Sequence, residues 1–369
     1  MFKRLMIALP LLVALTGCVN ETFKQDELTR GSEMIASPIL QENGFALNWQ
    51  ADVPIKLGES IRYVFNTGDY VLVFTSRNTV FCYNAQTGKL TFVRQISRPS
   101  LPLSPPSLHA GKVFTSVGQE VWSVDAPNAK VVKAFDIKSP TRQPVVFNSY
   151  SFYVTGLDRR ISCYSAEEGL LLFQVTADNN EELSTCFASD NYFWFAAKDG
   201  IVYCCKADEP VRVWGFATTA QITAAIVERG DYVYVGSTDT ILYKLNSITG
   251  NLNWKSHLGS PIIDKPTVYD DVVIQQTVSH GAYILDAATG KVILNTPDAL
   301  SFLSRKSDRV FFRCAGDVVK TVSIREGAVV GEMKVGPIAG TCLNELNSMI
   351  ILVSDEGKVA CFDAIRTIK

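Results

Sequence analysis

The chain is poor in the residues that most catalytic and metal sites require. Only three of its 369 residues are histidine, at His109, His257 and His280. None lies in a metal-binding spacing such as H-E-x-x-H, and no G-x-S-x-G, Walker loop or C-x-x-C occurs. The sequence therefore predicts no catalytic residues, no metal ligands and no bound cofactor, and it favours a non-enzymatic protein.

A block of basic residues is also missing. The chain has 35 Lys+Arg against 37 Asp+Glu, and neither sign of charge is gathered into a long run. Proteins that bind nucleic acid need clustered Lys and Arg to neutralise phosphates. The composition therefore argues against a nucleic-acid partner. Hydrophobic residues make up 47% of the chain, which is enough for a large core.

No apolar run approaches the roughly 20 residues that a membrane-spanning helix needs. The longest N-terminal run, at residues 5–15, follows Lys3 and Arg4. A short apolar run after a basic start is typical of a secretory signal peptide. We therefore expect residues 1–17 to be a signal peptide rather than part of the folded protein.

The signal peptide ends in a sequence that resembles the bacterial lipobox, Leu15-Thr16-Gly17-Cys18. The resemblance implies signal-peptidase cleavage between Gly17 and Cys18 and attachment of fatty acids, palmitate among them, to Cys18. Val19 follows the cysteine where lipoproteins kept at the inner membrane tend to have Asp, so the outer membrane is favoured. The alternative is an ordinary signal peptide with a chance cysteine.

One short segment recurs eight times along the rest of the chain. Three copies are clear and have the form Asn/Asp-x-x-Thr-Gly-x, and the intervals between all eight are 41, 40, 41, 40, 40, 37 and 40 residues. The copies begin at Asn84, Asp125, Ser165, Lys206, Asn246, Asp286, Ser323 and Asp363. Apolar runs rich in β-branched and aromatic residues flank each copy, which is typical of strands joined by a tight turn. Four strands in 40 residues is the content of a propeller blade.

The two ends of the repeat array complement each other. The last repeat has no outer strand, whereas Ala46-Leu-Asn-Trp-Gln50 resembles the outer strand Asn251-Leu-Asn-Trp-Lys255. We therefore predict an all-β chain with a single eight-bladed β-propeller at residues 45–369, whose N-terminal strand closes the last blade. Residues 18–44 are mostly polar and are predicted to be a lipidated, flexible tether.

Nine cysteines in an exported chain raise the question of disulfides. Besides Cys18, four fall at the same position of the repeat, at Cys82, Cys163, Cys204 and Cys361. Cys204 and Cys205 are neighbours in a predicted strand, so their side chains should point to opposite faces. We interpret these cysteines as small hydrophobic core residues. The alternative for Cys204-Cys205 is a vicinal disulfide of the kind found in some PQQ-dependent alcohol dehydrogenases.

The Thr-Gly-Lys turns and aromatic outer strands resemble the PQQ-like repeat family, and no blade carries the Trp-Asp dipeptide of WD40 repeats. With the lipobox and tether, the chain from Cys18 onward resembles the BamB-like lipoproteins. The resemblance implies a monomeric, lipid-anchored scaffold at the periplasmic side of the outer membrane. Its partner would be the β-barrel assembly protein and its complex. The alternatives are a propeller-mouth enzyme or redox-binding lipoprotein, and a cell-surface binding propeller.

Two inter-blade loops are candidate partner-binding segments. In the first, Arg98 to Pro106, Leu101 and Leu103 alternate with prolines, and such a strip loses little entropy when it docks. The leucines either face a partner or fold back and cap the second blade. The second loop carries Asp178, Glu181 and Glu182 and is interpreted as solvated, with cation binding as the alternative. Its acidic character departs from the leucines and arginine that contact the barrel protein in BamB-like relatives.

Overall fold

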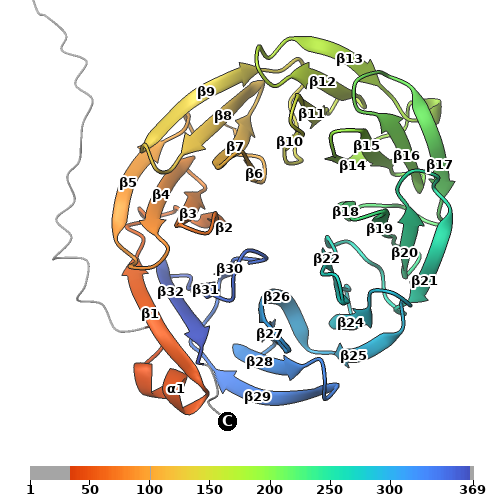
Figure 1. Cartoon of the computed structure of the whole chain (residues 1–369). Helices are drawn as coiled ribbons and strands as arrows, with labels where there is room; N and C mark the ends of the chain where they lie inside the picture. The colour runs from red at the N-terminus through yellow and green to blue at the C-terminus, as the bar shows by residue number, and fades with distance from the viewer. Residues whose placement is uncertain (1–33, 100, 366–369) are drawn as a thin grey trace, which may run out of the picture.

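The computed structural model describes residues 34–99 and 101–365 of the chain. It shows eight four-stranded antiparallel sheets arranged around a central channel (Figure 1). The prediction of an all-β, eight-bladed propeller is confirmed. One short α-helix, α1 (Ser37–Glu42), lies before the first strand, and one 3₁₀ turn, η2 (Asp178–Asn180), lies in an inter-blade loop.

The first four blades are simple meanders, numbered here from the inside outward. Blade 1 contains β2 (Ile61–Asn66), β3 (Tyr70–Thr75), β4 (Thr79–Asn84) and β5 (Leu90–Gln95). Blade 2 contains β6 (Ser107–His109), β7 (Lys112–Val117), β8 (Glu120–Asp125) and β9 (Lys130–Asp136). Blade 3 contains β10 (Val146–Phe147), β11 (Ser151–Thr155), β12 (Ile161–Ser165) and β13 (Leu171–Val175). Blade 4 contains β14 (Leu183–Ala188), β15 (Tyr192–Ala197), β16 (Ile201–Lys206) and β17 (Arg212–Ala217).

The remaining blades follow the same plan until the last one. Blade 5 contains β18 (Val227–Arg229), β19 (Tyr232–Gly236), β20 (Ile241–Asn246) and β21 (Leu252–His257). Blade 6 contains β22 (Thr267–Val268), β23 (Val272–Gln276), β24 (Ala282–Asp286) and β25 (Val292–Thr296). Blade 7 contains β26 (Ala299–Lys306), β27 (Arg309–Cys314), β28 (Val318–Ser323) and β29 (Ala328–Lys334). Blade 8 contains β30 (Gly340–Thr341), β31 (Ile350–Val353), β32 (Lys358–Ala364) and, outermost, β1 (Phe45–Asp52).

The ring is closed by its first strand, as the sequence predicts. β1 pairs antiparallel with β32 from Phe45 opposite Ala364 to Asp52 opposite Lys358. This pairing gives blade 8 the outer strand that the last repeat lacks. It also removes an open sheet edge at the point where the two ends of the array meet.

Each blade is buried on both faces, which explains why its strands read as nearly continuous apolar runs. In β19, Val233 and Val235 pack toward blade 4, whereas Tyr234 between them packs toward blade 6. Successive side chains of a strand point to opposite faces, so each blade contributes to two seams. The core therefore consists of eight apolar clusters, one for each seam of the ring.

The Thr-Gly turns hold neighbouring blades together through an aromatic ring. Trp254, on the outer strand of blade 5, donates from Nε1 to the carbonyl oxygen of Ala287 at 3.2 Å. Its indole lies against Gly290, where an added Cβ would come within 2.6 Å of the ring. Trp214 meets Gly250 and Trp49 meets Gly88 in the same way. Glycine is needed at these turns both for the positive φ and for the close approach of the ring.

The cysteine interpretation is confirmed for the part of the chain that the structure describes. All eight cysteines from Cys82 to Cys361 are free and buried. Cys204 packs in the seam between blades 4 and 5, and Cys205 packs in the seam between blades 3 and 4. The two sulfur atoms therefore lie on opposite faces of β16 and do not form a vicinal disulfide.

We expect these buried thiols to be unreactive in the native ring. Burial raises the pKa of Cys82, Cys163 and Cys205 to about 11, and that of Cys314 and Cys361 to about 12, so little reactive thiolate is present at pH 8. In a Cys18→Ser variant, intact-mass spectrometry should detect no iodoacetamide adducts on the native protein and eight after unfolding in guanidinium chloride. Alkylation of the native protein, or fewer than eight adducts after unfolding, would contradict this packing.

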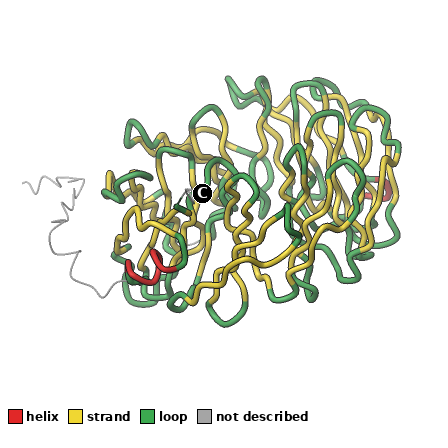
Figure 2. Tube along the Cα trace, turned by 60° about the horizontal axis from the view of Figure 1, so that its bottom comes forward, coloured by secondary structure: helices red, strands yellow, loops and turns green. Residues whose placement is uncertain are grey.

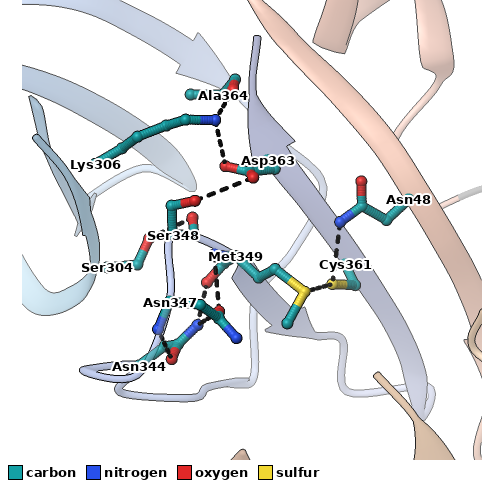
Figure 3. Close-up of polar contacts among 10 residues, drawn as sticks. All are labelled: Asn48, Ser304, Lys306, Asn344, Asn347, Ser348, Met349, Cys361, Asp363 and Ala364. Atoms are coloured by element: carbon teal, nitrogen blue, oxygen red, sulfur yellow. Dashed lines mark hydrogen bonds and ion pairs between the residues drawn. The ribbon is translucent and has the colours of Figure 1, made fainter. Parts of the chain in front are cut away.

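The seam between blades 7 and 8 has its own set of polar contacts (Figure 3). In most other blades, the residue at the position of Asp363 caps the tight turn to the outer strand, as Asn84 does by accepting from the amide of Thr87. In blade 8 the outer strand is β1, from the other end of the chain. Asp363 instead accepts from Lys306 Nζ of blade 7 at 3.3 Å and from Ser348 Oγ at 3.0 Å. The Asp363 carboxylate therefore links β26 of blade 7 to β32 of blade 8.

The folded part of the chain begins before the expected end of the tether. The side chain of Gln50 on β1 accepts from the amide of Met34 at 2.7 Å and donates to the carbonyl oxygen of Ile35 at 2.9 Å. Ile35 and Leu40 are buried against blades 7 and 8. The expectation that residues 18–44 form a flexible tether therefore does not hold from Met34 onward, because two apolar side chains fill the outer end of this seam.

Candidate interaction face

The connections between strands lie on two opposite faces of the ring (Figure 2). Because each blade is antiparallel, the turn between its second and third strands lies on the same face as the loop to the next blade. We call this face the inter-blade face. It carries loop 53–60 from blade 8 to blade 1, loop 96–106 from blade 1 to blade 2, and loop 176–182 from blade 3 to blade 4.

The proline-rich loop 96–106, described at residues 96–99 and 101–106, is hydrogen-bonded to Asn78. This residue is buried, has a φ of 59°, and lies in the turn between β3 and β4. Its side-chain amide donates to the carbonyl oxygens of Arg98 at 3.0 Å and Leu101 at 2.8 Å. Further along, Thr115 Oγ1 donates to the carbonyl oxygen of Ser104 at 2.7 Å. These bonds tie Arg98, Leu101 and Ser104 of the loop to blades 1 and 2.

The turn between β3 and β4 is also hydrogen-bonded to a second loop, loop 53–60. Arg77 Nη2 donates to the carbonyl oxygen of Leu57 at 3.0 Å. The side chain of Leu57 is 99% exposed and that of Leu101 is 51% exposed, and Arg98 is exposed as well. Leu57, Arg77, Arg98 and Leu101 thus come from three connected loops, and we call them the blade-1 patch. Its make-up of leucine and arginine, on loops hydrogen-bonded to the same turn, suits docking to another protein.

The two leucines of loop 96–106 that were predicted to bind a partner differ in burial. Leu101 is exposed, as expected for a partner-binding side chain. Leu103 is only 6% exposed, forms a β-bridge with Val117 and packs in the seam between blades 1 and 2. Leu103 therefore caps the core of blade 2, and its expected role in partner binding is withdrawn.

The acidic loop lies on the same face, but its charges are balanced. Asp178 accepts from Arg212 Nη1 at 3.0 Å, and the guanidinium lies 4.3 Å from the centre of the Tyr203 ring. Glu182 forms an ion pair with Lys198 at 2.8 Å, and this hydrogen bond lowers the pKa of the carboxyl group. Glu181 is half-buried. In residues 34–99 and 101–365, no three His, Cys, Asp or Glu side chains gather as metal ligands.

The remaining predicted site residues, Gly17 and Cys18, lie outside the described residues. In the part of the chain that is described, no helix is long and apolar enough to cross a membrane. The sequence prediction missed Leu57 and Arg77. The one sequence feature that could have indicated Leu57 is the segment Pro54-Ile-Lys-Leu-Gly58, in which a leucine lies between lysine and glycine in an expected loop.

The comparisons with known proteins agree with one another. The family model described as outer membrane protein assembly factor BamB matches residues 40–132 and 198–364. BamB from Yersinia pestis is 27% identical over 179 residues, which cover 42% of this chain and 45% of that relative. The match therefore spans under half of the relative's length.

Solved structures share the fold at lower sequence identity. The crystal structure of BamB from Moraxella catarrhalis aligns with a TM-score of 0.67 and 13% identity, over 86% of this chain and 99% of that one. The computationally designed Ika8 protein aligns equally well, with a TM-score of 0.67 and 15% identity, over 83% of this chain and 96% of its own. Because the family model matches most of the propeller, the chain belongs to the family of the outer membrane protein assembly factor BamB.

Proposed function

We propose that this chain is a non-enzymatic lipoprotein scaffold that supports the assembly and insertion of β-barrel proteins into the outer membrane. Cys18 carries the lipid anchor, and the propeller lies on the periplasmic side, bound to the barrel-assembly protein and its complex. Membership of the BamB family supports this role. The names of the Yersinia and Moraxella relatives point in the same direction.

The observation that carries the proposal is the blade-1 patch. Exposed leucines on the surface of a monomer are common, but here two of them lie on loops whose backbones are pinned by Asn78 and Arg77. A rigid loop loses little conformational entropy on binding, so apolar contacts contribute more fully to affinity. Arginine and leucine in one patch also suit a protein partner better than a small polar ligand.

The test is recovery of the partner from native membranes by crosslinking, affinity purification and mass spectrometry. We expect the wild type to recover components of the barrel-assembly complex. Leu57→Asp with Leu101→Asp should lower this recovery by about tenfold or more, because each change places a carboxylate in an apolar contact. The melting temperature should stay nearly the same, because both side chains are exposed.

Ile248→Asp is the matched control, since Ile248 is exposed in a turn on the opposite face of the ring. It should leave recovery unchanged. If the double variant recovers the complex as well as the wild type does, the blade-1 patch is not the interface. If the wild type recovers no barrel-assembly component and instead shows bound quinone absorbance, the enzyme alternative replaces the scaffold.

The anchor has a separate test. We expect Cys18→Ser to abolish incorporation of labelled fatty acid and to leave an unprocessed precursor or a protein in the soluble fraction, because several acyl chains on one cysteine supply the membrane affinity. Acyl labelling and membrane fractionation measure both effects. Normal labelling and fractionation of the variant would show that Cys18 is not the lipid attachment site.

A further inference from the structure

The wall of the central channel is recessed at blade 8. The innermost strand of this blade, β30, has only two residues, whereas the innermost strands on either side, β2 and β26, have six and eight. Figure 1 shows β30 between these two longer strands at the edge of the channel.

Two cavities occupy this recess. One, of about 430 Å³, lies along β2, and the other, of about 260 Å³, lies between the start of β26 and the inner part of blade 6. Thr341 and Leu343 of blade 8 line both of them. Leu343 is 44% exposed, so an apolar side chain projects between the two spaces. Their sizes fall in or near the range of ordinary ligand pockets.

The larger cavity follows the free edge of a strand. Five successive residues of β2, from Ile61 to Phe65, line it. Neighbouring side chains of a strand point to opposite faces, so a cavity that touches all five must run along the edge of the strand. The other edge of β2 pairs with β3. The edge facing the cavity therefore offers backbone amides and carbonyls to an added strand.

One cation in this cavity is without an acidic partner. Arg62 is exposed, lines the cavity, and forms no ion pair with any described residue. Glu59 lines the same cavity, but its carboxylate accepts from the amide of Lys56 at 3.0 Å and from the hydroxyl of Thr75. Asp355 also lines the cavity and is exposed, so the lining carries both signs of charge. Arg62 is the one cation among the described residues that line it, and it can pair with a carboxylate that enters from outside in a strong and directional contact.

The recess opens beside the blade-1 patch. Loop 53–60, which carries Leu57, also places Glu59 and Ser60 in the cavity wall, and loop 96–106, which carries Leu101, ends at the lining residue Pro106. A protein that docks on the blade-1 patch therefore lies beside a cavity bordered by the same two loops. These shared loops favour a segment of the same partner as the occupant.

We propose that the recess at blade 8 binds an extended segment of the partner that docks on the blade-1 patch. The segment adds as a strand to the free edge of β2, places an acidic side chain on Arg62, and packs an apolar side chain against Leu343. This inference rests on the proposed function, because it names a second contact made by the same partner.

The experiment places the photo-crosslinking residue p-benzoylphenylalanine at position 343 or at position 346 of the full-length, membrane-anchored chain. Leu346 is the matched control, since it is 55% exposed in the same loop and lines neither cavity. After irradiation of native membranes, position 343 should crosslink to one contiguous segment of a barrel-assembly component that contains Asp or Glu. Position 346 should not crosslink to that segment.

Substitutions test the chemistry of the site. Leu343→Asp and Arg62→Glu should each lower partner recovery by about tenfold, while Leu346→Asp should leave it unchanged. Reversing the charge of the crosslinked acidic residue to Lys should restore recovery to the Arg62→Glu variant. Unchanged melting temperatures of all three variants would show that the losses come from binding.

The outcomes separate this inference from the proposed function. If the wild type recovers the barrel-assembly complex and the Leu57/Leu101 variant loses it, but position 343 gives no crosslink and Leu343→Asp binds normally, the recess is not a binding site and the scaffold function stands. A crosslink from position 343 to residues 19–33 of this chain would replace the partner with an internal segment. If no variant and not even the wild type recovers the complex, both proposals are wrong.

Discussion

Trp49→Ala is expected to lower the free energy of unfolding by about 3–5 kcal/mol, the usual cost of removing a buried tryptophan. Trp49 is 6% exposed, stacks near Tyr83 and donates from Nε1 to the carbonyl oxygen of Ala85 at 2.7 Å. It lies on β1, the strand that closes the ring. Its loss weakens both the seam between blades 8 and 1 and the pairing of β1 with β32. Guanidinium chloride titration monitored by circular dichroism measures the change.

Two variants at the same strand serve as controls. Asn48→Ala removes an exposed neighbour and its long contact of 3.9 Å with Cys361 Sγ, so it should lower the free energy of unfolding by less than about 1 kcal/mol. Trp49→Phe keeps an aromatic ring but removes the indole donor, so it should cost less than the alanine variant. Deletion of residues 45–52 should destabilise the whole ring. A deletion variant that melts at the wild-type temperature would show that β1 does not close the propeller.

Gly290→Ala should destabilise the ring by roughly 2–4 kcal/mol, a large effect for one methyl group. An alanine there must adopt a φ of +71° and would place its Cβ 2.6 Å from the indole of Trp254. The backbone strain costs about 1 kcal/mol, and displacement of a packed ring adds about 1–3 kcal/mol. Thermal unfolding followed by calorimetry, with the same scan rate for all variants, measures the loss.

Gly111→Ala separates the two causes. Gly111 has a φ of +74°, close to that of Gly290, but nothing lies within 4 Å of its added Cβ. Its substitution should therefore cost only the backbone strain, about 1 kcal/mol. Equal destabilisation by the two variants would mean that the contact between glycine and tryptophan contributes nothing to the seam.

The parts of the structure that depend on local pattern were predictable from the sequence. The spacing of the Thr-Gly turns predicts the blade number because each turn joins the same two strands of one blade. The resemblance of Ala46–Gln50 to an outer strand predicts closure because β1 supplies the same aromatic contact, Trp49 on Gly88. The opposite packing of Cys204 and Cys205 follows from the alternation of side chains along a strand.

Features that depend on contacts between distant segments were not predictable in the same way. Leu101 and Leu103 have the same neighbours in the sequence, and only the bridge from Leu103 to Val117 decides which of them is buried. Leu57 is exposed because its loop is tied to Arg77, 20 residues away in the chain. The polar segment before β1 gave no sign that Ile35 and Leu40 fill a seam between two blades.

The recess at blade 8 could also not be predicted from the repeat. The repeat predicts an inner strand in every blade, but it does not set the length of that strand. β30 is short because the chain leaves the sheet after Thr341 for a loop in which Asn344 accepts from the amide of Leu346 and donates to the carbonyl oxygen of Met349. The residues that we propose bind a partner are therefore departures from the repeat.

The pairing of β1 with β32 sets the order in which the chain completes its fold. β1 is made early and its partner strand β32 last, so Phe45 has no seam to enter until nearly all the repeats have formed, whereas Trp49 also contacts blade 1. Contacts between such distant segments form slowly because a long loop must close first. Until then, both β1 and the exposed edge of β32 are open to wrong pairing with other chains. We therefore expect folding of this propeller to end with the pairing of β1 and β32, and the chain to be most prone to aggregate before that pairing forms.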